Sequence, residues 1–165
     1  MTRAVLSVGS NLGDRLSHLR LAVAGFADVL VAASPVYETK AWGVEDQPDF
    51  LNAVLIVDDP GADAWSWLRR GQALERRAGR VRDRRWGPRT LDVDVVTVEG
   101  VTSDHPDLLL PHPGTPQRAT VLIPWLAVDP DAVLPDHGPV VDLLAALPEE
   151  SKKDVRLRED LPLTP

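Results

Sequence analysis

The residues best suited to chemistry lie in one stretch, Arg80 to Val96, with the sequence RVRDRRWGPRTLDVDVV. Its first half is rich in arginine, and its second half alternates apolar residues with Asp92 and Asp94. A period of two predicts a β-strand, on which both carboxylates share one face with Cα atoms about 6.6 Å apart. Neighbouring carboxylates repel unless a cation lies between them, and Mg²⁺ takes one or two carboxylates together with substrate phosphates. The stretch therefore predicts one site that holds a polyanion.

Each half of this stretch also has a simpler interpretation. An Asp-x-Asp pair on an edge strand is often only a solvated face, and an arginine-rich loop is often solvated or binds nucleic acid. The whole chain has a net charge of −7, although residues 69–89 contain nine arginines against Glu75 and Asp83. Because an acidic protein is a poor nonspecific binder of nucleic acid, the basic segment favours a small anion as its ligand.

The composition narrows the class of protein further. The 165 residues are 44% hydrophobic and 26% charged, which indicates one globular domain over residues 1–165, with 149–165 either a loosely docked tail or a last strand. The absence of cysteine excludes disulfides, thiolate metal sites and cysteine nucleophiles. The apolar run from Ala4 to Val8 is too short for a signal peptide or a membrane span, so a cytoplasmic protein is expected.

The elements that must position these residues follow a definite order. Strands are predicted at residues 4–8, 29–37, 50–58 and 91–95. Amphipathic helices are predicted from the apolar stripe between Leu12 and Leu30 and over residues 62–78. This order predicts an α+β, ferredoxin-like βαββαβ antiparallel sheet with both helices on one face, the other face being open for a ligand. Extra C-terminal helices are expected at 117–128, broken or kinked by Pro124, and at 140–147.

Several polar residues on these elements are candidates for ligand contacts. Asn52 interrupts an apolar strand, and its amide either reads the edge of a heterocycle or bonds a neighbouring loop. Gln72 and Glu75 lie three residues apart on a helix, so they either face a site together or are solvated. The segment Thr39–Asp49 has no periodicity and is expected to be a loop, in which Trp42 is either a core residue or a binding aromatic.

The segment after the first strand, Gly9 to Asp14, has the sequence GSNLGD. Its glycines and Asn11 could hold a phosphate, but no Gly-Lys-Ser/Thr follows, so it is not a phosphate-binding loop of that type. A tight turn leading into a helix is the preferred interpretation of Gly9 and Gly13.

With these segments in view, the chain resembles the hydroxymethyl-dihydropterin pyrophosphokinase family of folate biosynthesis. The likeness covers roughly residues 3–145, and the motifs come in the order of the family. The most specific motif is Arg-Trp-Gly-Pro-Arg-x-x-Asp-x-Asp at residues 85–94. The other matching segments are GSNLGDR at 9–15, DQPDFLNA at 46–53, GRVR at 79–82 and LPHP at 110–113. The family fold is ferredoxin-like, in agreement with the predicted order of elements.

The resemblance implies a transfer of diphosphate from ATP to the hydroxymethyl group of 6-hydroxymethyl-7,8-dihydropterin, with release of AMP. By this resemblance Asp92 and Asp94 hold two Mg²⁺ ions, and Arg80 and Arg89 are the catalytic arginines. The residues it assigns to ATP are Gln72, Glu75, Arg82, His112 and Arg118. The residues it assigns to the pterin are Thr39, Trp42, Phe50, Asn52 and Trp86. Such a transfer needs positioning and charge neutralisation more than covalent chemistry, which suits these residue types.

The chain departs from the pattern of the family at two positions. The family usually has a phenylalanine that stacks on the second face of the pterin, and this chain has Thr120 there. Threonine cannot stack, so either Trp42 supplies the second aromatic wall or pterin binding is weakened, by about 1 kcal/mol. Asp107 stands where some members carry a basic residue near ATP, so that contact is expected to be absent.

Other functions compete with the pyrophosphokinase. A ferredoxin-like RNA-binding module would use the Arg80–Arg89 loop and Trp86, but it would need aromatic residues on the sheet where this chain has aspartates. A two-metal nuclease would need a further acidic cluster or a general base, and neither stands out. A catalytically dead relative is disfavoured because the aspartates and arginines are intact. We expect a monomeric enzyme acting on two small molecules, with no nucleic-acid or membrane partner.

Overall fold

A computed structural model describes residues 3–40, 48–79 and 90–163. Six of its strands form one sheet: β1 (Arg3–Ser10), β2 (Leu30–Ala33), β3 (Tyr37–Thr39), β4 (Phe50–Asp58), β5 (Asp92–Val98) and β10 (Arg156–Leu157). The helices are α1 (Arg15–Gly25), α2 (Ala64–Arg77), α3 (Ala119–Val128), α4 (Val140–Ala146) and α5 (Glu149–Lys152). Short elements complete the description: β6 (Ser103–His105), β7 (Leu108–Leu110), the 3-10 turn η1 (Thr115–Gln117), β8 (Val133–Leu134) and β9 (Gly138–Pro139).

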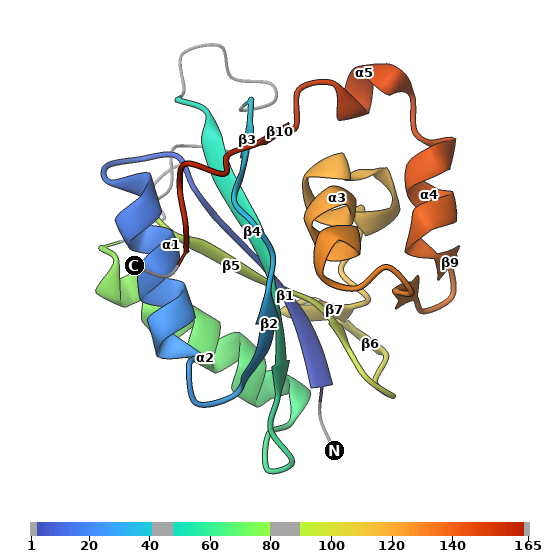
Figure 1. The fold of residues 1–165 in the computed structure, drawn as a ribbon. Coiled ribbons are helices and arrows are strands. Elements are labelled where there is room, and N and C mark those ends of the chain that lie inside the picture. The colour runs from blue at the N-terminus through green and yellow to red at the C-terminus, as the bar shows by residue number, and fades with distance from the viewer. Residues whose placement is uncertain (1–2, 41–47, 80–89, 164–165) are drawn as a thin grey trace.

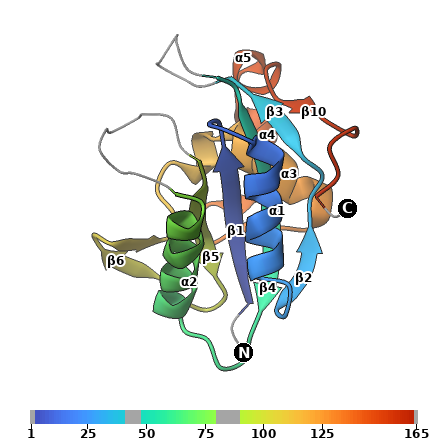
Figure 2. The same cartoon turned by 90° about the vertical axis from the view of Figure 1, so that its left-hand side faces the viewer.

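The sheet confirms the predicted ferredoxin-like arrangement. Its strand order is β10-β3-β4-β1-β5, with β2 also paired to β4, and every pairing is antiparallel. Helices α1 and α2 connect these strands and lie on the same face of the sheet (Figures 1 and 2). No helix in the described part of the chain is long and apolar enough to cross a membrane.

Local chemistry explains where the two helices begin. The carboxylate of Asp14 accepts a hydrogen bond from the backbone N–H of Ser17, so α1 starts at Arg15. Helix α2 begins with a capping box, in which Asp63 accepts from the N–H of Ser66 and the hydroxyl of Ser66 accepts from the N–H of Asp63. Both caps satisfy backbone donors that a helix start leaves without intrahelical partners.

Two boundaries predicted between residues 12 and 37 are wrong. The helix does not continue to Leu30, because the chain turns after Gly25 and Val29 donates its N–H to the carbonyl of Phe26 at 3.0 Å. The strand predicted at 29–37 is two strands, since Pro35 has no N–H for a ladder. Ser34 bridges the gap: its hydroxyl oxygen accepts from the N–H of Val54, and its own N–H donates to the carbonyl of Val54.

The two faces of the sheet are packed differently. The face toward α1 and α2 carries the larger core, in which Leu6 and Leu55 lie with Phe26 and Trp67 at no more than 1% exposure. The opposite face was expected to be open, and this is only half right. The part of it around Val5, Val54 and Val96 is covered by α3 and by the segment that includes α4, which lie together on this side of the sheet (Figure 1).

The cover on this second face depends on α3. Leu122 and Trp125 of α3 are buried against the apolar half of the face. The break expected at Pro124 is absent, because the helix runs through this residue to Val128. A proline removes one helical hydrogen bond, and burial of the neighbouring side chains offsets that loss.

The C-terminal strand β10 is joined to β3 by charged side chains. Glu38 accepts hydrogen bonds from Arg15 at 2.6 Å and from Arg158 at 2.5 Å, and its side chain is only 13% exposed. Burial raises the pKa of Glu38, but the hydrogen bonds and charges of both arginines outweigh burial, so the pKa lies below its ordinary value of 4.5. The carboxylate is therefore ionised at neutral pH and holds α1, β3 and the C-terminal segment together.

We predict that Gly71→Ala destabilises the protein. A Cβ atom at this position in α2 would lie 2.8 Å from Cγ1 of Val93, a stiff side chain between Asp92 and Asp94. Alanine favours the helix by about 1 kcal/mol, but overpacking costs about 1–3 kcal/mol. A lower free energy of unfolding in a denaturant titration is therefore expected. Gly61→Ala, whose Cβ would have no neighbour closer than 3.5 Å, is the control. An equally stable Gly71→Ala protein would contradict the close packing of α2 on β5.

We predict that the stabilising effect of Glu38 depends on pH. Because the pKa of Glu38 is lowered by folding, its stabilisation is present above the unfolded value of about 4.5 and is lost as the pH falls through the folded pKa. Glu38→Gln should therefore cost about 1–2 kcal/mol at pH 7, and this difference should shrink at acidic pH. Urea titrations at several pH values measure it, with the exposed Glu99→Gln as control. A difference that stays constant with pH would contradict the ionic role.

Candidate active site

A row of directly paired residues crosses the sheet on its second face. Tyr37 of β3 pairs with Asn52 of β4, Asn52 with Gly9 of β1, and Gly9 with Asp92 of β5. Directly opposed residues of antiparallel strands point to the same face. Asn52 and Asp92 therefore flank β1, with backbones about 10 Å apart at two strand spacings. An amide and a carboxylate from distant parts of the sequence are brought to one surface.

Gly9, in the middle of this row, has no side chain and lets the Asn52 amide lie close to β1. A Cβ atom at Gly9 would lie 2.9 Å from Oδ1 of Asn52 and 3.7 Å from a ring carbon of Phe50. The interpretation of Gly9 as a turn residue is wrong, since it lies within β1, whereas Gly13 has a φ of +73° and does form the turn. An isolated glycine in a strand often marks a place where another group approaches the backbone closely. The glycine at position 9, directly after an apolar run, was the sequence feature that could have indicated this close approach.

Three residues predicted to bind the pterin lie together on β3 and β4. Thr39 pairs with Phe50, and the side-chain amide of Asn52 donates a hydrogen bond of 2.7 Å to the hydroxyl of Thr39. Both ends of the Asn52 amide are thereby oriented, with its nitrogen toward Thr39 and its oxygen toward Gly9. The remaining N–H and the carbonyl oxygen have the donor and acceptor pattern needed to read a heterocycle edge.

The two aspartates have the geometry that their spacing predicted. Asp92 pairs with Gly9 and Asp94 with Ser7, so both carboxylates lie on the second face of edge strand β5. Both are partly buried, and the side chain of Asp94 is 31% exposed. Within residues 3–40, 48–79 and 90–163, no group of three or more His, Cys, Asp or Glu could hold a metal ion. Paired carboxylates are ligands that suit Mg²⁺, which completes its shell with water and substrate oxygens.

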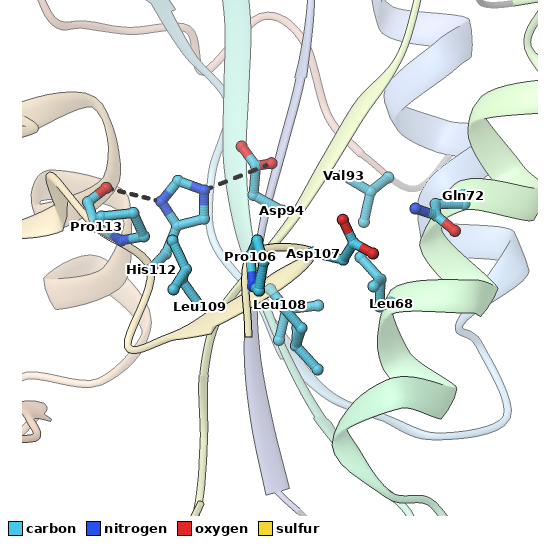
Figure 3. Close-up of a pocket in the computed structure, with 11 residues that line it drawn as sticks. Leu68, Gln72, Val93, Asp94, Pro106, Asp107, Leu108, Leu109, His112 and Pro113 are labelled. Carbon is cyan, nitrogen blue, oxygen red and sulfur yellow. Dashed lines mark hydrogen bonds and ion pairs between the residues drawn. The ribbon is translucent and has the colours of Figure 1, made fainter. Parts of the chain in front are cut away.

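His112 faces Asp94 from the turn after β7. Its Nε2 lies 4.0 Å from Oδ1 of Asp94, and its Nδ1 lies 2.9 Å from the carbonyl oxygen of Pro113 (Figure 3). A carbonyl only accepts, so Nδ1 carries the proton and Nε2 of the neutral ring is an acceptor. Burial lowers the pKa of His112, opposed by the hydrogen bond to Pro113, and the charge of Arg118 lowers it further. Neutral His112 and Asp94 thus present two acceptors to one space, which a ligand cation or donor would fill.

An irregularity in β5 positions this histidine. The register between β1 and β5 shifts so that Leu6 pairs with Val95 and Val5 with Thr97, leaving Val96 as the extra residue. The backbone N–H of His112 donates to the carbonyl of Val96 at 2.8 Å. The Leu110–Pro111 peptide just before it is cis. The position of His112 relative to Asp94 is therefore set by the backbone of the same strand that carries the aspartates.

Of the two interpretations of Glu75 made from the sequence, the solvated one is wrong, since the residue is 3% exposed. Its assignment to the nucleotide site stays a prediction. Its Oε2 accepts a hydrogen bond of 2.9 Å from the backbone N–H of Val93, the residue between the two aspartates. The helix thereby holds β5 on the side away from β1, where no other strand of the described residues pairs with it in the sheet. Tertiary packing produced this contact, and the spacing of Gln72 and Glu75 gave no signal of it.

A pocket of about 210 Å³ extends from Asp94 and His112 toward α2. Gln72 and Leu68 of α2 lie at its far side, and Asp107 lies between them and His112 (Figure 3). Gln72 is thus brought to the same cavity as Asp94, and its contact to the nucleotide stays a prediction. The lining is part apolar and part polar, which is the usual character of a small-molecule site.

The remaining predicted residues fall into two groups. Arg118 is exposed at the start of α3, close enough to act on His112 electrostatically, and Thr120 is half-buried in the first turn of that helix. The residues outside the described part of the chain are Trp42, Arg80, Arg82, Trp86 and Arg89. The geometry described above therefore does not include the arginine-rich segment, residues 80–89.

Comparison with known proteins agrees with this geometry. Residues 5–130 match the family model for 7,8-dihydro-6-hydroxymethylpterin-pyrophosphokinase (HPPK). The chain is 53% identical to the 2-amino-4-hydroxy-6-hydroxymethyldihydropteridine pyrophosphokinase of Mycobacterium tuberculosis, covering 95% of this chain and 90% of that protein. It is 40% identical to the protein of the same name from Pseudomonas aeruginosa, covering 90% and 93%.

Among solved structures, the fold is similar to HPPK-DHPS of Plasmodium falciparum, crystallised with SDX-DHP. The TM-score is 0.62 at 14% identity, over 88% of this chain and 43% of that one, so this likeness concerns the fold alone. The model match and the sequence identity carry the assignment of family. On this basis the chain belongs to the 7,8-dihydro-6-hydroxymethylpterin-pyrophosphokinase family.

Proposed function

We propose that the protein transfers diphosphate from ATP to the hydroxymethyl oxygen of 6-hydroxymethyl-7,8-dihydropterin and releases AMP, as the pyrophosphokinase of folate biosynthesis. Membership of the family supports the reaction. The structural observation that carries the proposal is the row from Asn52 through Gly9 to Asp92. It sets an amide that can read a heterocycle beside a pair of carboxylates, with only a glycine between them.

The pterin binds, in this proposal, over β3 and β4. Asn52 reads the heterocycle edge with its free N–H and carbonyl oxygen, and Thr39 holds the amide in place. Phe50, which pairs with Thr39, offers a ring to one face of the pterin. This placement points the hydroxymethyl group across Gly9 toward β5. Trp42 and Trp86 are assigned to the pterin by resemblance alone.

The diphosphate binds beside β5. Asp92 and Asp94 would hold Mg²⁺, two ions by resemblance to the family, and the metal would supply charge neutralisation at the phosphate oxygens and favour ionisation of the hydroxyl. Gln72, His112 and Arg118 would contact the nucleotide. Arg80, Arg82 and Arg89 would neutralise the developing phosphate charge, which planar guanidinium groups do through paired hydrogen bonds.

The reaction balances with these groups in place. The hydroxymethyl oxygen attacks the β-phosphorus, its proton passes to solvent or to a neighbouring base, and the bond from the β-phosphorus to the α,β-bridging oxygen breaks. AMP leaves with that oxygen. Glu75 takes no part in these steps; we assign it to holding Val93, and so the aspartates, in register.

We predict that Asp94→Asn abolishes the reaction. AMP release from ATP and Mg²⁺ should require the pterin in wild type and fall by about a hundredfold or more in the variant, because a metal ligand is lost. The exposed Asp142→Asn, on α4, is the matched control and should keep wild-type activity. Formation of ADP in place of AMP would mean attack at the γ-phosphorus, and the proposed reaction would then be wrong.

We predict that Asn52→Ala and Gly9→Ala both weaken pterin binding. The first removes the amide that reads the heterocycle, and the second places a Cβ atom 2.9 Å from its oxygen. The dissociation constant of the pterin, measured by calorimetry, should rise about tenfold or more, while that of an ATP analogue changes little. Unchanged pterin affinity in Asn52→Ala would contradict the assignment of the pterin to β3 and β4.

A further inference from the structure

The C-terminal strap, residues 154–163, lies outside residues 5–130 that match the family model. Its strand β10 pairs antiparallel with β3, with Arg156 opposite Glu38 and Leu157 opposite Tyr37. The N–H of Arg158 extends this pairing by donating to the carbonyl of Val36 at 2.9 Å. Figure 1 shows the strap crossing from the α5 side to β3 and then running down beside α1. The strap thus forms the sheet edge next to the strand that carries Thr39.

Arginines of the strap bind residues adjacent to the proposed pterin contacts. Arg158 donates to Glu38 at 2.5 Å, and Glu38 directly precedes Thr39. Arg156 donates to the carboxylate of Asp49 at 2.9 Å, and Asp49 directly precedes Phe50. Each arginine therefore acts one residue away from a side chain assigned to the pterin.

Further contacts hold the same two positions from other sides. Asp154 of the strap lies 4.0 Å from the ammonium group of Lys40, which follows Thr39. Arg15 of α1 donates both to Glu38 at 2.6 Å and to the carbonyl oxygen of Asp49 at 2.9 Å. Glu38 and Asp49 are thus tied to the strap and to α1 by connected ion pairs and hydrogen bonds through Arg15, Arg156 and Arg158, and Lys40 pairs separately with Asp154. Connected pairs of this kind are worth more than isolated surface pairs.

The far end of the strap is fixed independently. Two guanidinium nitrogens of Arg20 donate to the carbonyl oxygen of Pro162, at 3.0 and 2.8 Å. Leu163 is 8% exposed and belongs to the main core, and Leu161 packs against it. Because its end is buried in the core, the strap has a defined place on the sheet and can restrain the strand that it pairs with.

We propose that the C-terminal strap is a positioning element for the pterin half of the active site. β3 is only three residues long, and a short strand opens locally at small cost unless neighbours hold it. The strap keeps β3 and the start of β4 in the arrangement that binds pterin. If the binding-competent fraction falls, the apparent dissociation constant rises by the same factor. The inference rests on the proposed function, because it assumes that Thr39, Phe50 and Asn52 contact the pterin.

The strap should act on one substrate only. Its hydrogen bonds and ion pairs to other elements reach α1, Val36, β3, Lys40 and Asp49. The nucleotide pocket is lined instead by residues of α2, β5 and the segment from Pro106 to Pro113. A role limited to global stability would affect both substrates equally, so the two roles make different predictions.

The test is the double variant Arg156→Gln/Arg158→Gln in the full chain. Calorimetry would measure the dissociation constants of the hydroxymethyl-dihydropterin and of a non-hydrolysable ATP analogue, and steady-state assays would measure kcat and KM. The pterin constant and KM should rise about three- to tenfold, with the ATP constant within about twofold and kcat at saturating pterin retained. The milder Arg156→Gln, at an exposed residue, keeps the test valid if the double variant folds poorly.

Two comparisons sharpen this test. Arg3→Gln removes an arginine 3.9 Å from Asp58 at the far end of β1 and β4, and should leave pterin affinity unchanged. Arg158→Lys keeps the charge without the planar fork and should restore part of the affinity. Faster amide exchange at Tyr37 to Thr39 in the double variant would locate the effect in β3.

The outcomes separate the two proposals. If Asn52→Ala weakens pterin binding and the strap variants do not, the strap inference is wrong and the proposed site stands. If the strap variants weaken both substrates in parallel with a loss of folding stability, the strap is only structural and the inference is again wrong. If Asn52→Ala leaves pterin binding unchanged, the assignment of the pterin to β3 and β4 is wrong. The strap inference is then wrong as well, because it depends on that assignment.

Discussion

The active surface depends on the register between three antiparallel strands. Pairing of Asn52 with Gly9 and of Gly9 with Asp92 puts the amide, the gap and the carboxylates on one face. A slip of one residue would turn every side chain of a strand to the other face. Leu51 or Val93 would then point to the ligand, and the polar groups would enter the core. The hydrophobic alternation that buries Leu6, Val8 and Leu55 is therefore what orients the site.

A second constraint is the concentration of acidic groups around β5. Asp92 and Asp94 lie on one side of the strand, while Glu75 is buried behind it with its carboxylate on the N–H of Val93. His112 adds a neutral acceptor. Such a cluster favours binding of cations and of groups that bring cations with them.

The second face of the sheet is divided between packing and binding. Val5, Val54 and Val96 are covered by α3 and its neighbours, while Asn52 and Asp92 lie beyond the cover. The covered half gives the site a rigid base, because β4 and β1 run through both halves. On the uncovered half, Thr39 of β3 lies next to the C-terminal strap, whereas Asp94 and Gln72 line the pocket beside α2.

The sequence by itself determined the elements and the chemistry of the residues they carry. Alternation around Asp92 and Asp94 predicted their shared face, the apolar run at 50–58 predicted β4 at its observed bounds, and the order of elements predicted the fold. The motifs also indicated the family. These signals are local, since periodicity and caps act over a few neighbouring residues.

Only the tertiary structure decided how distant segments meet. Gly9 was interpreted as a turn residue, Glu75 as a ligand contact or a solvated residue, and the second face as open. In the folded chain Gly9 lies within β1 beside the Asn52 side chain, Glu75 is buried and bonds the aspartate strand, and α3 covers half of that face. Each of these arrangements depends on contacts between residues far apart in the sequence. Glu75 contacts Val93, eighteen residues away, and Gly9 lies beside Asn52 of another strand. Such contacts form only when the whole core packs, and no local pattern encodes them.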